Sequence, residues 1–184
     1  HTTVTEIRQL LQADRVFIGL VEQGTIGKVV AESVDYNYPS IMGWVADESY
    51  IREVEVVLQQ QNAIVINNIA EVDVGSRRYQ MFQRYQTQAA LIVPILLGDM
   101  PFGVLVAHQC SHPHQWEQSE IDLLEKLATQ VAIAIQQAQL YEQVQLLNSN
   151  LERQVQERTL ELQHKIEELQ ELSKVKDFFL HAVS

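Results

Sequence analysis

The chain has 184 residues, enough for one compact domain and an extension. It carries 24 acidic side chains against 13 lysines and arginines, which argues against nucleic acid or an anionic membrane surface as its partner. The single cysteine, Cys110, excludes an internal disulfide and a cysteine-rich metal site, and it fits a reducing, cytoplasmic compartment. No apolar run approaches the roughly 20 residues of a membrane span, so we expect no direct membrane insertion.

Residues 1–139 show short apolar runs separated by turn residues, a pattern typical of a mixed α/β (α+β) domain. In chain order the pattern predicts a helix, two paired strands, a helix, a short strand, a third helix and a hairpin. The expected ranges are 3–11, 15–21 with 28–34, 48–59, 63–66, 76–86, and 89–97 with 102–109. Turns are expected at 23–25 and at Gly98-Asp99. Pro94 falls inside a predicted strand, which indicates a bulge or an edge position.

The last third of the chain reads as one long helix, because residues 114–184 contain no proline or glycine. Ser119 is the predicted N-cap, and Glu120 and Asp122 in the first turn favour the helix dipole. A continuous helix to the end of the chain would be about 100 Å long at ~1.5 Å per residue. No single small core can bury that length, so we expect the helix to pack on something else.

The apolar residues of this helix recur in steps of three and four, which together make an eleven-residue repeat. The seam, as we call this set, consists of Val144, Leu147, Leu151, Val155, Arg158, Leu162, Ile166 and Leu169. It predicts a parallel two-stranded coiled coil, and so a homodimer through the C-terminal helix; the alternative is one solvated amphipathic helix. Arg158 interrupts the apolar stripe, so two registers of the coil can lie close in energy.

The end of the chain resembles the start of the phosphoacceptor box of sensor histidine kinases, K-x-x-F-L-x-x-x-S-H. Lys176, Phe179, Leu180 and Ser184 match that pattern. The resemblance implies that the phosphorylated histidine would follow Ser184. His181 falls four residues too early and is expected to be a solvated helix residue.

The segment before this box contains Glu157-Arg158-Thr159, which resembles the Glu-Arg-Thr signature of signalling helices that join sensor domains to kinase domains. The two resemblances together imply a signalling-helix coiled coil over 140–175 and a truncated phosphoacceptor domain over 176–184.

Several segments of the first part resemble the GAF domains of phytochromes and cyanobacteriochromes. They are residues 3–11, 13–16, 27–33 and 91–95, the run Ala107-His108-Gln109-Cys110-Ser111, the pair Gln115-Trp116, and residues 120–124. The resemblance implies a GAF sensor domain over 1–139, with an antiparallel sheet flanked by helices and a pocket between the sheet and the loops.

The tetrapyrrole chemistry of that family needs a cysteine that forms a thioether to the bilin. The attachment Cys-His pair aligns with Arg77-Arg78, and the second thiol of some members aligns with Ser49. The family's Tyr-Arg-Phe after Asp-Arg-Val is also absent. Cys110 falls at a strand end, where we expect a buried structural thiol. The sequence therefore argues against covalent bilin, and no cofactor is expected.

Four residues are candidates for ligand binding. A histidine in the strand of His108 contacts the chromophore in phytochrome-like relatives, and the acidic residue of the second-thiol motif is retained as Asp47. Tyr85 aligns with the phenylalanine of the family's Phe-Gln pair. Arg77, close to Arg78 and Arg84, suggests an anion-binding surface, with a solvated basic helix face as the alternative.

An H-x-C-x-H-x-H array, formed by His108, Cys110, His112 and His114, superficially suggests zinc. Only His108 and Cys110 would share a face of an extended strand, because side chains two residues apart point the same way. His112 and His114 fall in the loop before the long helix, so we expect no metal site.

These observations predict a sensory and dimerising input module of a two-component sensor histidine kinase. No phosphate-cradling glycine loop or nucleophile–base pair is present, so this segment is not expected to be an enzyme. The resemblance implies that ATP binds only in a kinase domain of the parent protein, whose partner is a response regulator. The alternatives are a non-covalent bilin photoreceptor and a ligand-free structural dimerisation module.

Overall fold

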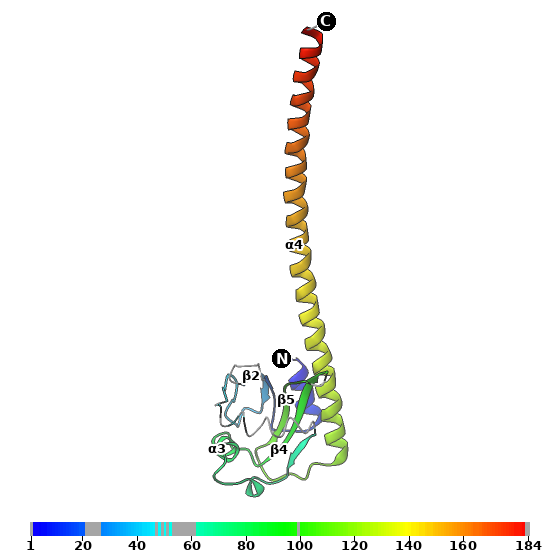
Figure 1. Ribbon diagram of the computed structural model, residues 1–184. Coiled ribbons are helices and arrows are strands. Elements are labelled where there is room, and N and C mark those ends of the chain that lie inside the picture. The colour runs from blue at the N-terminus through cyan, green and yellow to red at the C-terminus, as the bar shows by residue number, and fades with distance from the viewer. Residues whose placement is uncertain are drawn as a thin grey trace. The chain divides into compact units, whose positions relative to one another are not determined.

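The computed structural model describes residues 2–20, 27–46, 48, 50, 52, 62–98 and 100–182. The elements in chain order are α1 (Thr2–Leu10), β1 (Arg15–Leu20), β2 (Lys28–Val34), β3 (Ile64–Ile66), a 3-10 turn η1 (Ile69–Glu71), α3 (Arg77–Arg84), β4 (Ala89–Leu97), β5 (Met100–Gln109) and α4 (Gln118–Ala182) (Figure 1). The predicted helix over 48–59, the turn at 23–25 and Asp99 lie wholly or mostly outside the described residues.

The strands form one five-stranded antiparallel sheet in the order β2-β1-β5-β4-β3. The hairpin β4–β5 is sequential, and β1 joins it by pairing with β5 from Arg15↔His108 to Leu20↔Gly103. This order confirms the predicted sheet with flanking helices and the long C-terminal helix, and it puts β5 at the centre of the sheet.

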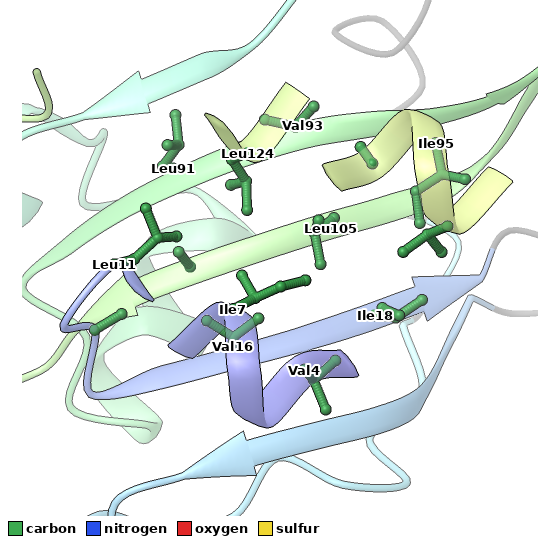
Figure 2. Close-up of a cluster of buried hydrophobic side chains, with 14 of the residues drawn as sticks. Val4, Ile7, Leu11, Val16, Ile18, Leu91, Val93, Ile95, Leu105 and Leu124 are labelled. Carbon is green, nitrogen blue, oxygen red and sulfur yellow. The ribbon is translucent and has the colours of Figure 1, made fainter. Parts of the chain in front are cut away.

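One face of the sheet carries α1 and the first turns of α4. Because successive strand residues point to opposite faces, Val16 and Leu105 face this side. Figure 2 shows Ile7 of α1 and Leu124 of α4 on the same side of the sheet as Leu105. Burial of these apolar side chains is the main source of stability in this layer.

The opposite face carries α3. Phe17, Ile92 and Val106 alternate with the residues of the first face and pack with Met81 and Phe82 of α3. The sheet is therefore covered on both sides, and β5 contacts both layers.

Helices α1 and α3 end in the same way, with a residue of positive φ. Gln12 (φ 49°) and Gln86 (φ 57°) take the left-handed conformation that glycine usually supplies. The N–H of Ala13 then donates to Arg8 O, and that of Thr87 to Phe82 O, which closes both helix ends. The reversal at Gln86 ends α3 at Arg84, two residues before the predicted end, whereas α1 ends within one residue of its prediction.

The start of α4 corrects one prediction. Ser119 is not the N-cap, because the helix already begins at Gln118. The carboxylate of Glu120 instead accepts the backbone N–H of Glu117 at 2.8 Å, half of a reciprocal capping box.

Pro94 is accommodated at a free edge. Strand β3 pairs only with Ala90, Leu91 and Ile92, so no described strand flanks β4 on that side at Pro94. The irregularity in pairing lies one residue further, between Ile95 and Leu96.

By its internal contacts the chain divides into two units, His1–Gln136 and Gln137–Ser184. In the second unit every described side chain is exposed, and the apolar members of the seam are 44% to 65% exposed. Ion pairs one turn apart, Arg153–Glu157 and Lys165–Glu161, lie along its surface. Among the described helices, none combines the length and the apolar character needed to cross a membrane.

The central strand pair tolerates no side chain at Gly103. A Cβ there would lie 2.4 Å from the carbonyl oxygen of Gly19 and 3.3 Å from Leu20 Cα. We expect Gly103→Ala to destabilise the domain by about 1–3 kcal/mol, the range for overpacking. Gly75→Ala is the matched control, because its Cβ would meet only Asp73 carboxylate oxygens at 3.7 Å. Urea unfolding measures both, and equal stabilities would contradict the close approach.

Candidate functional site

A cavity of about 50 Å³ lies on the α3 face of the sheet. Strand β5 contributes Val104, Val106 and His108, which share a face because they are two residues apart. Apolar side chains from other segments, including Phe17 and Met81, complete much of the wall. Trp44 and Tyr50 also line the cavity, and their rings meet edge to face with centroids 4.9 Å apart.

His108 is a fully buried polar group in this wall. Its Nδ1 lies 3.2 Å from Arg15 Nη1 and 3.1 Å from Thr87 Oγ1. A guanidinium can only donate, so Nδ1 accepts and the ring hydrogen resides on Nε2. Burial and the neighbouring charge of Arg15 hold the pKa of His108 well below its usual value, so the ring is neutral.

The second ring nitrogen of His108 is in a different situation. Nε2 is buried and has no hydrogen-bond partner among the described residues. The rings of Phe17 and Phe82 lie edge-on to the imidazole, with centroids 5.2 and 5.5 Å away. The geometry therefore fixes a neutral Nε2–H donor in apolar surroundings.

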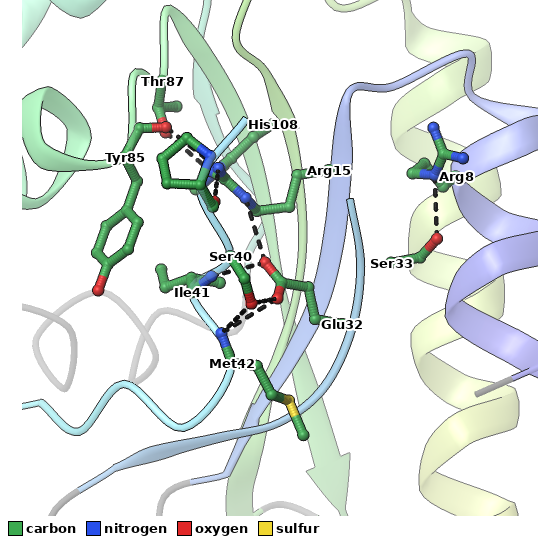
Figure 3. A network of polar contacts seen from close by, with 11 residues as sticks. Arg8, Arg15, Glu32, Ser33, Ser40, Ile41, Met42, Tyr85, Thr87 and His108 are labelled. Carbon is green, nitrogen blue, oxygen red and sulfur yellow. Dashed lines mark hydrogen bonds and ion pairs between the residues drawn. The ribbon is translucent and has the colours of Figure 1, made fainter. Parts of the chain in front are cut away.

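Arg15 is the residue that fixes this tautomer, and its side chain is fully buried. Nη2 donates to Pro39 O at 2.7 Å and to Tyr85 O at 3.2 Å (Figure 3). Nε lies 3.4 Å from Glu32 Oε1, an ion pair without the geometry of a hydrogen bond. A buried charge with these partners is compensated electrostatically.

Glu32 extends the network into the following loop. Its carboxylate accepts the backbone N–H groups of Ile41 at 2.8 Å and Met42 at 3.1 Å, and also the hydroxyl of Ser40. The loop that contains these residues is therefore tied through Glu32 and Arg15 to His108 (Figure 3).

The predicted site residues fall in different places. His108 lines the cavity. Tyr85 contributes its carbonyl to Arg15, and its ring lies beneath the Arg15 and Arg84 guanidinium groups. Arg77 is exposed, its Nη1 donates to Gln80, and it does not line the cavity. Asp47 lies outside the described residues.

Residues that the sequence analysis did not select complete the site. Arg78, one position after the predicted Arg77, lines the cavity. Arg15, Glu32 and Thr87 set the state of His108. In the sequence, Arg15 is marked only by its position directly before the apolar run Val16-Phe17-Ile18. In the structure, Arg15 and all three residues of that run are buried.

Cys110 is buried outside this cavity wall, and its backbone N–H donates to Asp14 Oδ2 at 2.8 Å. Burial raises the pKa of its thiol to about 11, which disfavours the nucleophilic thiolate. His114 contacts Glu120 at 3.1 Å, and His112 contacts Ser111. Within the described ranges, no three histidine, cysteine or acidic side chains are grouped so that they could hold a metal ion.

The buried neutral His108 makes a pH-dependent contribution to stability. Its pKa is lowered on folding, so the unfolded chain binds the extra proton as the pH falls below about 6.5. The stabilisation is present above that pH and is lost below it, by at most about 1.4 kcal/mol per pH unit. We expect His108→Asn, whose amide oxygen can replace Nδ1 as acceptor, to remove this component. Urea unfolding of both proteins between pH 7.5 and 5 measures it; identical slopes would contradict a buried neutral His108.

Comparison with known proteins places this chain in a family. The sequence profile described as GAF domain matches residues 1–135. The circadian input-output histidine kinase CikA of Thermosynechococcus vestitus is 34% identical over 98% of this chain, and the chain spans 26% of that protein.

Solved structures agree. The blue-light absorbing form of the Thermosynechococcus elongatus PixJ GAF domain is 30% identical, with a TM-score of 0.70 over 78% of this chain and 86% of that one. A far-red absorbing protein with bound biliverdin is 25% identical, with a TM-score of 0.67 over 75% and 88% of the two chains. The chain belongs to the GAF domain family, and its relatives include histidine kinases and photoreceptor GAF domains.

Proposed function

We propose that this chain is the sensory and dimerising input module of a two-component sensor histidine kinase. In this role the GAF pocket receives a signal and a coiled coil passes it to the kinase core. The observation that carries the proposal is the continuity of α4. Its first turns contribute Leu124 and Ala128 to the core of the GAF domain, and the same helix carries the exposed apolar seam further along the chain.

The route from the pocket to α4 is short within the first unit. His108 and Val106 of β5 line the cavity, while Leu105 and Ala107 of the same strand pack in the cluster that includes Leu124 of α4. A displacement of β5 by an occupant of the cavity is therefore transmitted directly to the start of α4, because close-packed layers do not absorb it.

The seam supports a parallel homodimer. Each aliphatic side chain that becomes fully buried contributes on the order of 1.5–3 kcal/mol of stabilisation. Burial of the seven apolar seam residues in a dimer is therefore strongly favoured over their exposure to water on a single helix. Arg158 is compatible with the seam because Glu161 balances it at 2.9 Å. Hydrogen bonds from Lys165 and Arg158 lower the pKa of Glu161, which keeps that carboxylate charged.

The proposed parent is a cytoplasmic kinase that uses ATP to phosphorylate the histidine after Ser184 and passes the phosphate to a response regulator. Support comes from the kinase relative, of which this chain spans about a quarter, and from the match at Lys176 and Leu180. The segment itself provides the input and the dimer contact rather than catalysis.

A bilin receptor is the second candidate function, favoured by the likeness to the biliverdin-bound structure. Three observations weigh against a covalent pigment in this chain. Arg77 stands at the attachment position, Cys110 is buried with a raised pKa, and the cavity of about 50 Å³ is far below the roughly 300–1,000 Å³ of typical ligand pockets. A non-covalent bilin would require the cavity to enlarge several-fold.

We expect the dimer to depend on the seam. Leu162→Glu should raise the dimer dissociation constant by roughly a hundredfold or more, because it would place two charged groups in the apolar interface of the proposed dimer. Leu160→Glu is the matched control, since Leu160 is exposed to a similar degree (66% against 60% for Leu162) and lies outside the seam. Light scattering and sedimentation measure the mass; a monomer at micromolar concentration, or equal effects of the two substitutions, would exclude the seam as the interface.

We expect no covalent tetrapyrrole after co-expression with bilin biosynthesis, because no described thiol lines the cavity. A denaturing gel stained with zinc reports covalent bilin by fluorescence, and a GAF domain that carries the attachment cysteine controls for bilin supply. Absorbance of the native protein separates a non-covalent pigment. A fluorescent band from this chain would refute the expectation.

A further inference from the structure

We infer that Asn67 is a positioning residue for α4. Its backbone and its side chain both hold the segment directly before α4, while its neighbours in sequence pack on the α3 face of the sheet. The inference rests on the proposed input role. It adds to that role a second connection between the cavity and α4, which passes around the β3 edge of the sheet rather than through β5.

Asn67 directly follows β3 and provides two acceptors to one short segment between β5 and α4. Its backbone oxygen accepts the N–H of His114 at 3.0 Å, and its side-chain Oδ1 accepts the N–H of Trp116 at 3.1 Å. Two bonds from one residue fix both the position and the direction of the segment, whereas a single bond would leave it free to pivot.

The segment that Asn67 holds is joined to α4 by packing and by a helix cap. Trp116 is buried in the same cluster as Leu124 of α4. His114 Nε2 lies 3.1 Å from both carboxylate oxygens of Glu120, and Glu120 Oε2 also accepts the N–H of Glu117. A displacement of this segment therefore moves the first turn of α4, because close-packed side chains do not absorb it.

The residues next to Asn67 connect it to the cavity. Ile64 of β3 lines the cavity, and Ile66 is buried in the cluster on the α3 face. Ile69 of η1 packs against the same cluster. Residues 64–69 thus contact the α3 face through three isoleucines and the start of α4 through Asn67.

The adjacent asparagine provides a matched comparison. Asn68 Oδ1 accepts the N–H of Ala70 at 3.0 Å and so caps η1. Both asparagines are half-buried, and of the two side chains it is that of Asn67 that bonds to the segment before α4. Asn68→Ala therefore matches Asn67→Ala in the atoms removed and differs in the partner that is lost.

Amide hydrogen exchange on the 184-residue chain tests the contact with α4. Asn67→Ala leaves the N–H of Trp116 without its acceptor, so exchange at residues 120–124 should become roughly tenfold faster relative to the amides of β5. Strand β5 is the reference because exchange in a central strand reports global unfolding. Asn68→Ala should leave the ratio unchanged, and Asn67→Asp, which keeps an acceptor oxygen, should restore it.

A second pair of substitutions tests the connection to the cavity. Ile64→Val removes one methyl group from the cavity wall on β3 and should speed exchange at residues 120–124 roughly twofold, the lower limit for coupled residues. In the Asn67→Ala background the same substitution should have no effect there. Val104→Ala truncates the wall on β5, which β4 separates from β3, and should act equally in both backgrounds.

Four results would overturn the inference. They are equal effects of Asn67→Ala and Asn68→Ala, an equal acceleration in β5, no restoration by Asn67→Asp, and an Ile64→Val effect that is absent or independent of Asn67. None of these results bears on the dimer, whose mass is measured separately. Failure of this inference and failure of the proposed input role are therefore distinguishable.

Discussion

The buried guanidinium of Arg15 is the constraint on which the rest of the site depends. A charge without access to water is tolerated only when its partners are provided by the protein. Here they come from segments far apart in the chain: Glu32 in β2, the carbonyl of Pro39, the carbonyl of Tyr85 after α3, and His108 in β5. The contact between Arg15 and His108 also determines which nitrogen of His108 carries the proton.

Much of the fold follows from the sequence, because period-two apolar patterns and turn residues are local signals. The pairing of β1 with β2 and the β4–β5 hairpin were predicted in this way, and the edge position of Pro94 was one of two predicted alternatives, the other being a bulge. The end of α3 was not, since Gln86 takes a left-handed conformation that usually falls on glycine. For the site, His108 was found through family resemblance, whereas Arg15 was missed because a single charge beside an apolar strand usually indicates exposure.

The second unit is stabilised by different interactions from those that stabilise the first. Its stability as an isolated helix would rest on pairs such as Arg153–Glu157, each worth only a few tenths of a kcal/mol at an exposed surface. In the proposed homodimer, a second copy that covers the exposed seam would supply the missing energy. A polar residue at Arg158 would lower that energy locally, which suits the proposed signalling role of the coil.

Rotational phase is the most direct test of transmission through the coil. In a fusion of this chain to a histidine kinase core after Ser184, deletion of residues 144–154 removes one eleven-residue unit and turns the output helix by only about 20°. Deletion of residues 144–145 turns it by about 200°. Autophosphorylation assays should show activity retained in the first fusion and sharply altered in the second. Equal activity in both would mean that the coil is a passive tether, and transmission through it would be excluded.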